Sequence, residues 1–229
     1  MPATFTNNIV IKTKGFKQAM AGLEEIPQEA KQALEDAIKE TLGFLREEIP
    51  RIVHQRYDIS MSSLMDQSHR TGKWKMIPKV TEKGGYIVDG GMEVIGTRIP
   101  TMRFNVNPTY VPVQRGIPVR ARQVVTVTVR RGKAHVGQPN TFIARMKSGH
   151  IGVFHRKEDA KHRIRPDGQR TALNITEDYR ISVPEMLQGK QLQRQLRNNT
   201  TKFFNRKCEE EVERVIKNLK QSPPTEETP

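Results

Sequence analysis

The chain has 229 residues, a length that fits one large domain or two small ones. Only 35% of the residues are hydrophobic, and 39 Lys and Arg against 25 Asp and Glu give a formal net charge of +14. No apolar run is long enough to cross a bilayer, the first residues lack a secretory signal pattern, and a single cysteine excludes an internal disulfide. We therefore expect a protein that is made and assembled in a cytoplasm and has no membrane partner.

The N-terminal part predicts one strand and one long helix. Residues 5–12 alternate between apolar and polar side chains, which favours a strand. From Gln28 to Ile49 the apolar residues recur at steps of three and four, which is typical of an amphipathic helix. A residue before proline is disfavoured in the helical conformation, so we expect this helix to end at or before Pro50. Another helix is expected to begin within residues 16–26.

Short strands are expected through the centre of the chain. The turn signal Asp89-Gly90-Gly91 between two apolar segments predicts a hairpin. Alternating Val and Thr in residues 124–130 predict a half-buried strand. Residues 141–146 and 150–156 predict an antiparallel pair around Ser148-Gly149. Shorter strands are expected at residues 103–106 and 134–136.

The remaining segments predict loops, a second helix and a tail. Residues 58–75 and 158–170 are polar and aperiodic and are expected to be irregular loops. Apolar residues from Leu192 to Leu219 recur at helical spacing, and the proline-rich residues 221–229 are expected to be disordered. This order of elements predicts one α+β domain over residues 1–220. In it, an antiparallel sheet is packed by a long N-terminal helix and a C-terminal helix, with long loops.

The basic residues are concentrated in the middle third of the chain. Residues 94–157 contain no Asp or Glu at all. Such an imbalance usually indicates a polyanionic partner or an acidic protein surface, and a solvated basic face is the alternative. The candidate residues for an interface with protein or DNA are the basic residues of this region and of the loop after it: Arg130, Arg131, Lys133, Arg145, Lys147, Arg156, Lys157, Lys161, Arg163 and Arg165.

No familiar arrangement of catalytic or metal-binding side chains is found. His150, His155 and His162 are close in sequence but have no Cys or acidic ligand at a familiar spacing. Cys208 lies in a charged part of the expected C-terminal helix, and no nucleophile elbow or phosphate loop is present. We expect no enzymatic activity, no metal and no cofactor; the alternative is a metal-dependent nuclease that uses the three histidines. Aromatic residues are only 6%, so any DNA contact is expected to be with phosphates and not with bases.

Three segments resemble a known family. Residues 142–156 read Phe-Ile-Ala-Arg-Met-Lys-Ser-Gly-His-Ile-Gly-Val-Phe-His-Arg and resemble a signature of the phage minor tail protein Z family, found in lambdoid phages and many prophages. Residues 178–186 keep the family's Tyr, Ser, Val, Pro and Met but carry Arg180-Ile181 where Gly-Pro is usual. Residues 96–100 with Phe104 are also similar. In the first block we expect Phe142, Ile143, Val153 and Phe154 in the core, and Gly149 and Gly152 in turns or close packing.

The resemblance, which covers residues 95–187, implies a structural virion protein. Members of that family act at the head-proximal end of a phage tail, in tail completion and head–tail joining, without a cofactor. The implied assembly is a homo-oligomeric ring around the DNA channel, next to the tail terminator and head-closure (neck) proteins, in a virion assembled in the bacterial host cytoplasm. Two alternatives remain: a non-specific nucleic-acid-binding module and a tail-assembly chaperone.

Overall fold

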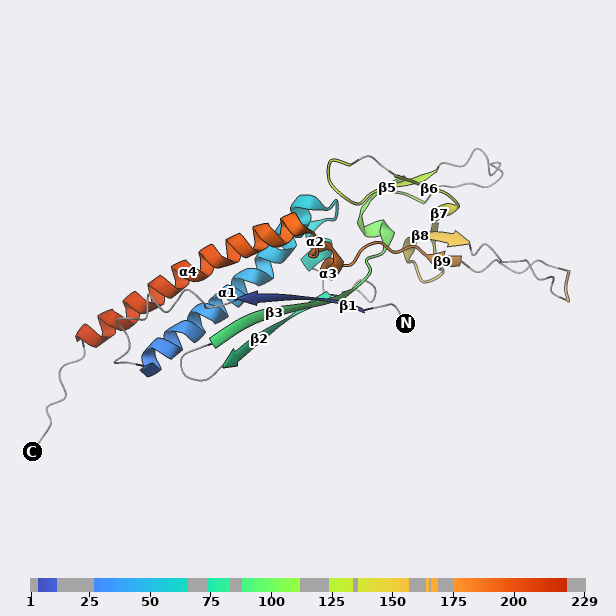
Figure 1. Cartoon of the computed structure of the whole chain (residues 1–229). Coiled ribbons are helices and arrows are strands. Elements are labelled where there is room, and N and C mark those ends of the chain that lie inside the picture. Colours follow the sequence, from blue (N-terminus) through green and yellow to red (C-terminus); the bar gives the residue numbers. More distant parts are fainter. Residues whose placement is uncertain are drawn as a thin grey trace, which may run out of the picture. The chain divides into compact units, whose positions relative to one another are not determined.

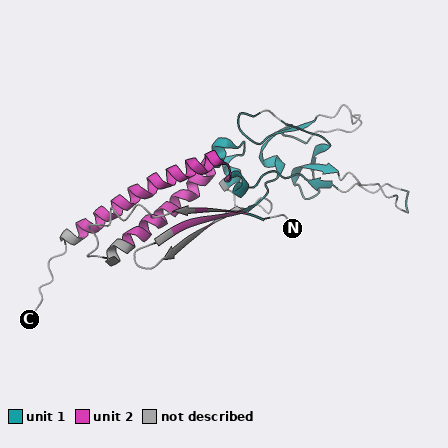
Figure 2. Ribbon diagram, viewed as in Figure 1, with its two compact units in different colours: residues 1–5, 53–74, 96–186 teal, residues 6–52, 75–95, 187–229 magenta. Residues whose placement is uncertain are grey.

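The computed structural model describes residues 4–11, 27–65, 74–82, 88–111, 124–133, 136–156, 164, 166–168 and 175–221. It is an α+β structure with antiparallel sheets, a long N-terminal helix and a C-terminal helix, so the predicted fold class is confirmed. The chain forms two compact units (Figure 2). The helical unit is Thr6–Ile52, Lys75–Ile95 and Leu187–Pro229, and the strand-rich unit is Met1–Phe5, Val53–Trp74 and Gly96–Met186. The single domain expected for residues 1–220 stays a prediction.

The helical unit consists of two long helices and a sheet. Its elements are most of α1 (Pro27–Arg56), α4 (Lys190–Gln221) and the sheet of β1 (Thr4–Ile11), β3 (Val88–Thr97) and β2 (Trp74–Glu82), with strand order β1–β3–β2. In Figure 1, α1 lies between α4 and this sheet. Because it is covered on two sides, α1 buries a wide apolar face, and Ile38, Leu45 and Ile49 are all 0% exposed.

The first helix continues past Pro50, so the predicted end at that residue is wrong. A proline inside a helix removes one backbone hydrogen bond and disfavours the helical conformation of the residue before it. However, Ile49, Ile52 and Val53 are completely buried on both sides of the proline, and α1 ends only at Arg56. Packing of the apolar face therefore offsets the local cost of the proline, because most helix stability in proteins comes from tertiary burial.

The hairpin predicted around Asp89-Gly90-Gly91 is also wrong, because β3 runs straight through these residues. Gly90, Met92 and Val94 are buried, whereas the residues between them are half-buried. This period of two is that of a strand with one face on a core. The buried face of β3 packs in the helical unit, and this burial outweighs the turn preference of the two glycines.

The two long helices are antiparallel and meet through side chains spaced four residues apart on α1. The partners on α4 come in the reverse order. The four contacts are Asp36 with Arg214 (3.6 Å), Glu40 with Lys207 (2.8 Å), Phe44 stacked on Phe203 (4.3 Å between ring centroids) and Glu48 with Asn199 (2.7 Å). Residues four apart lie on one face of a helix, so this row of contacts fixes the register of the pair.

Glu48 is the buried member of this row, with only 2% of its surface exposed. Its carboxylate accepts hydrogen bonds from the guanidinium of Arg51 at 2.6 and 2.7 Å and from the amide of Asn199 at 2.7 Å. A buried charge is tolerated only when it is paired and hydrogen-bonded, and here both conditions are met.

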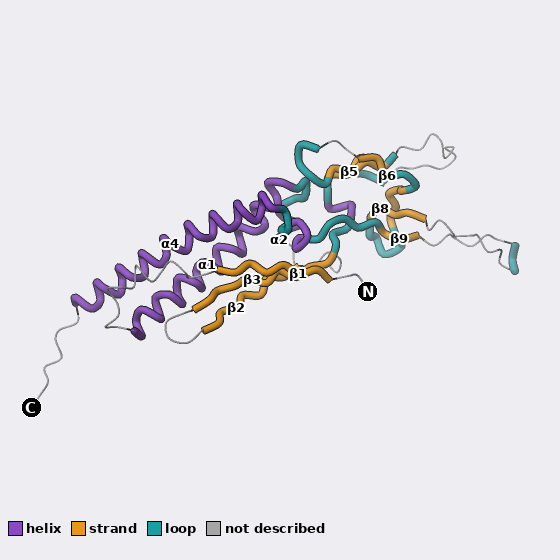
Figure 3. The backbone as a smooth tube through the Cα atoms, viewed as in Figure 1, coloured by secondary structure: helices purple, strands orange, loops and turns teal. Residues whose placement is uncertain are grey.

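The strand-rich unit has short elements connected by long loops (Figure 3). Two three-stranded antiparallel sheets have the orders β4–β5–β6 and β7–β8–β9, so the strands that the structure describes lie in three sheets. The elements are α2 (Met61–Met65), the 3₁₀ helix η2 (Thr101–Arg103), β4 (Asn105–Asn107), β5 (Val125–Thr128), β6 (Val136–Gln138), β7 (Thr141–Arg145), β8 (Ile151–Arg156), β9 (Ile175–Glu177) and α3 (Val183–Met186).

Several predicted segments differ locally from the structure. The irregular segment expected at residues 58–75 contains α2, whose start is held by the Ser60 hydroxyl, which accepts from the backbone N–H of Ser63 at 3.2 Å. The strand expected at 103–106 is shared between η2 and β4. The helix start expected within 16–26, most of the loop at 158–170 and the tail after Gln221 lie outside the described residues. None of the helices that the structure describes is both long and apolar enough to span a membrane.

The buried carboxylate of Glu48 gives a test of the pairing between α1 and α4. We expect Glu48→Ala to lower the free energy of unfolding by about 1–3 kcal/mol, because it leaves the half-buried Asn199 amide without its acceptor. The matched control is Glu47→Ala, which removes an exposed carboxylate from the same turn and should change stability by less than about 0.5 kcal/mol. Urea denaturation measures both values, and equal effects would contradict the assigned role.

Candidate interaction surfaces

The segment that resembles the tail protein family forms the hairpin of β7 and β8. Its register pairs Phe142 with Phe154 and Ile143 with Val153, so the predicted strand pair is confirmed. The turn contains Gly149 at a φ of +85°, a conformation that favours glycine. Ile143, Val153 and Phe154 are at most 6% exposed, as expected for the core, whereas Phe142 is half-buried.

Gly152 packs closely against the side chains of Glu177 and Phe154. A Cβ at this glycine would lie 2.8 Å from Glu177 Oε1. The same oxygen is 2.8 Å from His150 Nε2, and the Tyr179 hydroxyl donates to Glu177 Oε2 at 3.0 Å. Burial and this bond to Glu177 raise the pKa of Tyr179 to about 12. The carboxylate of Glu177 is therefore held by its own unit.

The second block of the resemblance also has structural roles. Ser182 and Glu185 form a capping box at the start of α3: the Ser182 backbone N–H and hydroxyl both donate to Glu185 Oε2 at 2.8 Å. Val183 and Met186 are completely buried. Arg180, which departs from the family pattern, forms an ion pair with Asp178 at 2.8 Å.

The described carboxylates of this unit mostly face inward or toward neighbouring groups of the same unit. Asp178 Oδ2 accepts from the Thr101 hydroxyl at 2.8 Å, and Asp58 Oδ2 accepts from the Asn105 amide at 2.9 Å. Glu185 also lies 3.6 Å from the Arg98 guanidinium. Residues 94–157 contribute no further carboxylate to the unit.

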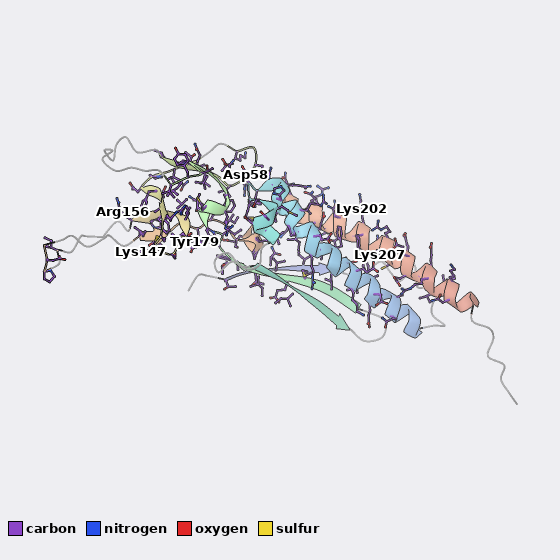
Figure 4. The ribbon with its side chains drawn as sticks, turned by 180° about the vertical axis from the view of Figure 1, so that it is seen from behind. Asp58, Lys147, Arg156, Tyr179, Lys202 and Lys207 are labelled. Atoms are coloured by element: carbon purple, nitrogen blue, oxygen red, sulfur yellow. The ribbon has the colours of Figure 1, made fainter. Side chains whose placement is uncertain are left out.

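The six described candidates are all exposed, but the structure gives them different roles. Figure 4 labels two of them, Lys147 and Arg156. The Arg130 guanidinium lies 5.9 Å from the ring centroid of Tyr57, and that of Arg156 lies 5.2 Å from the centroid of Phe142, so aromatic rings support both. Lys133, Arg145 and Lys147 contact no carboxylate within the described part of the chain. Lys157, Lys161, Arg163 and Arg165 lie outside the described residues.

Arg131 is a structural residue and not a free cation. Its Nε donates to the backbone carbonyls of His54 at 2.8 Å and Tyr57 at 3.2 Å, and its backbone N–H donates to the carbonyl of Arg56 at 2.9 Å. These carbonyls belong to the C-terminal end of α1, where the helix itself supplies no donors and a positive charge is favourable. The sequence did not indicate this role, because the two segments are more than 70 residues apart.

Exposed apolar side chains accompany the basic residues of the strand-rich unit. Val124 and Val136 are each 59% exposed and Met146 is 38% exposed. We use the name mixed basic surface for these three residues together with Lys133, Arg145, Lys147 and Arg156, which are all exposed and come from both sheets of the unit. Apolar, Met and Arg side chains together are typical of the surfaces that proteins use to bind other proteins.

A second basic surface lies on α4, and the sequence analysis missed it. Residues 186–208 contain no Asp or Glu, and the exposed side chains Lys190, Arg194, Arg197, Lys202 and Arg206 belong to this stretch. The absence of acidic residues from the first half of the predicted helix is the sequence signal that indicates this surface. Apolar spacing predicts the helix but does not indicate which cations lie on its exposed face.

The metal-ligating and nucleophilic side chains of the described residues have the following contacts. No three His, Cys, Asp or Glu side chains of that part of the chain are grouped so that they would hold a metal ion. Cys208 is 3% exposed, and burial followed by the charges of Glu209 and Glu211 raises the pKa of its thiol to about 12. His150 contacts Glu177, but no nucleophile with a basic partner lies beside them among the contacts of the described residues. Comparison with family models, curated proteins and solved structures finds no match to this chain.

The capping role of Arg131 predicts a stability effect that its charged neighbour lacks. We expect Arg131→Ala to lower the free energy of unfolding by about 1–2 kcal/mol, because the carbonyls at the end of α1 lose a charged donor. Lys133→Ala, two residues away, should change it by less than about 0.5 kcal/mol. Chemical denaturation checks both variants, and a stability loss for Lys133→Ala equal to that of Arg131→Ala would contradict the account.

The raised pKa of Cys208 predicts an unreactive thiol. Because the thiolate is the reactive form, we expect native protein at pH 8 to react with a disulfide reagent at least about 100-fold more slowly than protein in 6 M guanidinium. The absorbance of the released thiolate follows the reaction. Rapid labelling of the native chain would show that Cys208 is accessible and would contradict its burial.

Proposed function

We propose that this chain is a structural component of the head-proximal end of a bacteriophage tail, with a role in tail completion and head–tail joining. The observation that carries the proposal is the structural role of the two segments that resemble the tail protein family. The first block builds the β7–β8 hairpin and the second builds the Ser182–Glu185 cap, both as packing and capping residues with no reactive arrangement between them. The residues that resemble the family therefore form a scaffold, as a structural role requires.

The mixed basic surface is the proposed contact with neighbouring proteins. Its cations lack carboxylate partners among the described residues, and Val124, Val136 and Met146 would leave water on binding. Two copies of a basic surface repel one another, so the fitting partner is an acidic rim of a different protein in an adjacent ring, such as a tail terminator or a neck protein. Within a homo-oligomeric ring, each copy uses two different surfaces, as closed rings with heterologous contacts require.

One further function has support from a specific observation. The unpaired cations Arg145 and Lys147 at the end of the β7–β8 hairpin would also suit a non-specific nucleic-acid-binding module. Such a module would act as a free protein, whereas the proposed component acts inside the particle. Apolar side chains beside the cations favour the protein contact, because phosphate binding makes no use of them.

The proposed assembly role predicts the effect of removing two exposed apolar side chains. We expect Val136→Ser with Met146→Ser, supplied in trans to a phage or prophage genome lacking this gene, to reduce the yield of infectious particles by roughly tenfold or more. Separate heads and tails should accumulate and be visible by negative-stain electron microscopy. The control is Ile216→Ser, which removes an apolar side chain of 39% exposure from the helical unit.

The outcomes of this experiment separate the alternatives. Complementation by the double variant at the wild-type level would contradict the mixed basic surface as an assembly contact. Normal joining of heads to tails in the complete absence of the gene would contradict the proposed function itself. A requirement for the gene, with the protein missing from purified particles, would indicate an assembly chaperone.

A further inference from the structure

The first half of α4 presents a face of unusual composition to solvent. Every exposed position from Lys190 to Arg206 carries Lys, Arg, Gln, Asn or Thr, and none carries an acidic or an apolar side chain. The opposite side of the same turns is buried through Leu192, Leu196 and Phe204. The helix is therefore anchored by one face, and the other consists of polar and cationic groups alone.

The cations of this face are arranged in a row. Lys190, Arg194, Lys202 and Arg206 occupy positions separated by multiples of four residues, with Asn198 at the position between them and Arg197 beside it. Neighbouring positions in this row rise by about 6 Å and turn by about 40° per step, so the row covers about 24 Å and winds around the helix by about 160°. The buried side chains follow the same four-residue spacing, so the cationic row stays opposite the core along its length.

Four cations of this face have no carboxylate partner among the described residues, whereas cations elsewhere on the helix pair are paired. Lys207 contacts Glu40 and Glu210 at 2.8 and 2.7 Å, which raises its pKa, and Arg214 pairs with Glu211. Arg206 lies 3.6 Å from Glu210. Within the described residues, Lys190, Arg194, Arg197 and Lys202 contact no carboxylate. Like charges four residues apart on a helix repel one another, and an anionic ligand would remove this repulsion.

We propose that this face of α4 binds the phosphate backbone of double-stranded DNA without sequence preference. The site is separate from the mixed basic surface, and the proposal does not depend on the function proposed above. A protein partner would be expected to meet apolar side chains at the centre of its interface, and this face has none. Interfaces with DNA are more polar and strongly positive, and Lys, Arg, Gln, Asn and Thr all donate to phosphate oxygens.

The face fits duplex and not single-stranded nucleic acid. Proteins that bind single strands without sequence preference stack the bases on aromatic side chains. Phe203 is the aromatic residue nearest the row in sequence, and its ring is stacked on Phe44 at 4.3 Å between centroids, inside the helix pair. Binding is thus limited to phosphates, which a duplex presents in regular rows on its surface.

Electrostatic binding of this kind has a measurable salt dependence. If the four unpaired cations each neutralise one phosphate, the logarithm of the binding constant should fall against the logarithm of the salt concentration with a slope of about −3.6. Affinity would then fall about 150-fold between 50 and 200 mM salt. This slope measures the number of phosphate contacts and is independent of any role in a virion.

The test is fluorescence anisotropy of a labelled 30-base-pair duplex of random sequence with the full chain, at several salt concentrations. The triple variant Arg194→Gln, Arg197→Gln and Lys202→Gln keeps residues of good helix propensity, and we expect its slope to be smaller in magnitude by about 2.7. Circular dichroism confirms that the variant is folded. The matched control is Lys133→Gln, Arg145→Gln and Lys147→Gln, which removes the same charge from the mixed basic surface and should leave the slope nearly unchanged.

Three results would overturn the proposal. The first is no binding of the duplex by the wild-type chain at 50 mM salt. The second is an equal change of slope in both triple variants, which would show a response to net charge and not to a site on α4. The third is displacement of the duplex by polyglutamate as effective as displacement by unlabelled duplex, which would identify an acidic protein as the partner. None of these results bears on whether the chain is part of a phage tail.

Discussion

Asp58, Glu177, Asp178 and Glu185 each accept hydrogen bonds or form ion pairs within the strand-rich unit, and the placement of these few carboxylates decides the character of its surface. A carboxylate that already holds a hydroxyl, an amide or a guanidinium is not available to neutralise an exposed cation elsewhere. The acid-free stretch from residue 94 to 157 supplies no replacement. Among the described residues, Lys133, Arg145, Lys147 and Arg156 have no carboxylate partner and remain available to an external partner, and the proposed assembly role depends on this imbalance.

In the helical unit, the placement of carboxylates instead sets how α1 and α4 pair. Along the contact between α1 and α4, Asp36, Glu40 and Glu48 are matched with Arg214, Lys207 and Asn199, so charge is used to set the register of the helix pair. The first half of α4 carries cations without matching acids, on a face that contributes nothing to the core. The two basic surfaces differ in one further respect: only the one in the strand-rich unit includes exposed apolar side chains. This difference in composition is the physical reason for assigning protein to one surface and DNA to the other.

Local sequence patterns predicted the secondary structure that is set by interactions between residues close in the chain. The apolar spacing of α1 and α4 and the alternation around Ser148-Gly149 indicated the helices and the hairpin that the structure contains. The prediction failed where tertiary burial outweighs local preference: α1 continues through Pro50, and β3 continues through Asp89-Gly90-Gly91. The described candidate residues are all exposed cations, as a basic surface requires. The sequence did not show that Arg131 binds carbonyls at the end of α1, whereas Arg145 and Lys147 do not. Such a distinction depends on contacts between distant segments, which composition does not record.

The most direct test of the central claim is cryo-electron microscopy of intact particles produced by the genome that encodes this chain. The account predicts density for the chain at the junction of head and tail, in a ring, with the β7–β8 hairpin facing an adjacent protein ring. Purified particles that contain every other tail component but no density for this chain would contradict the claim that it is a structural part of the virion.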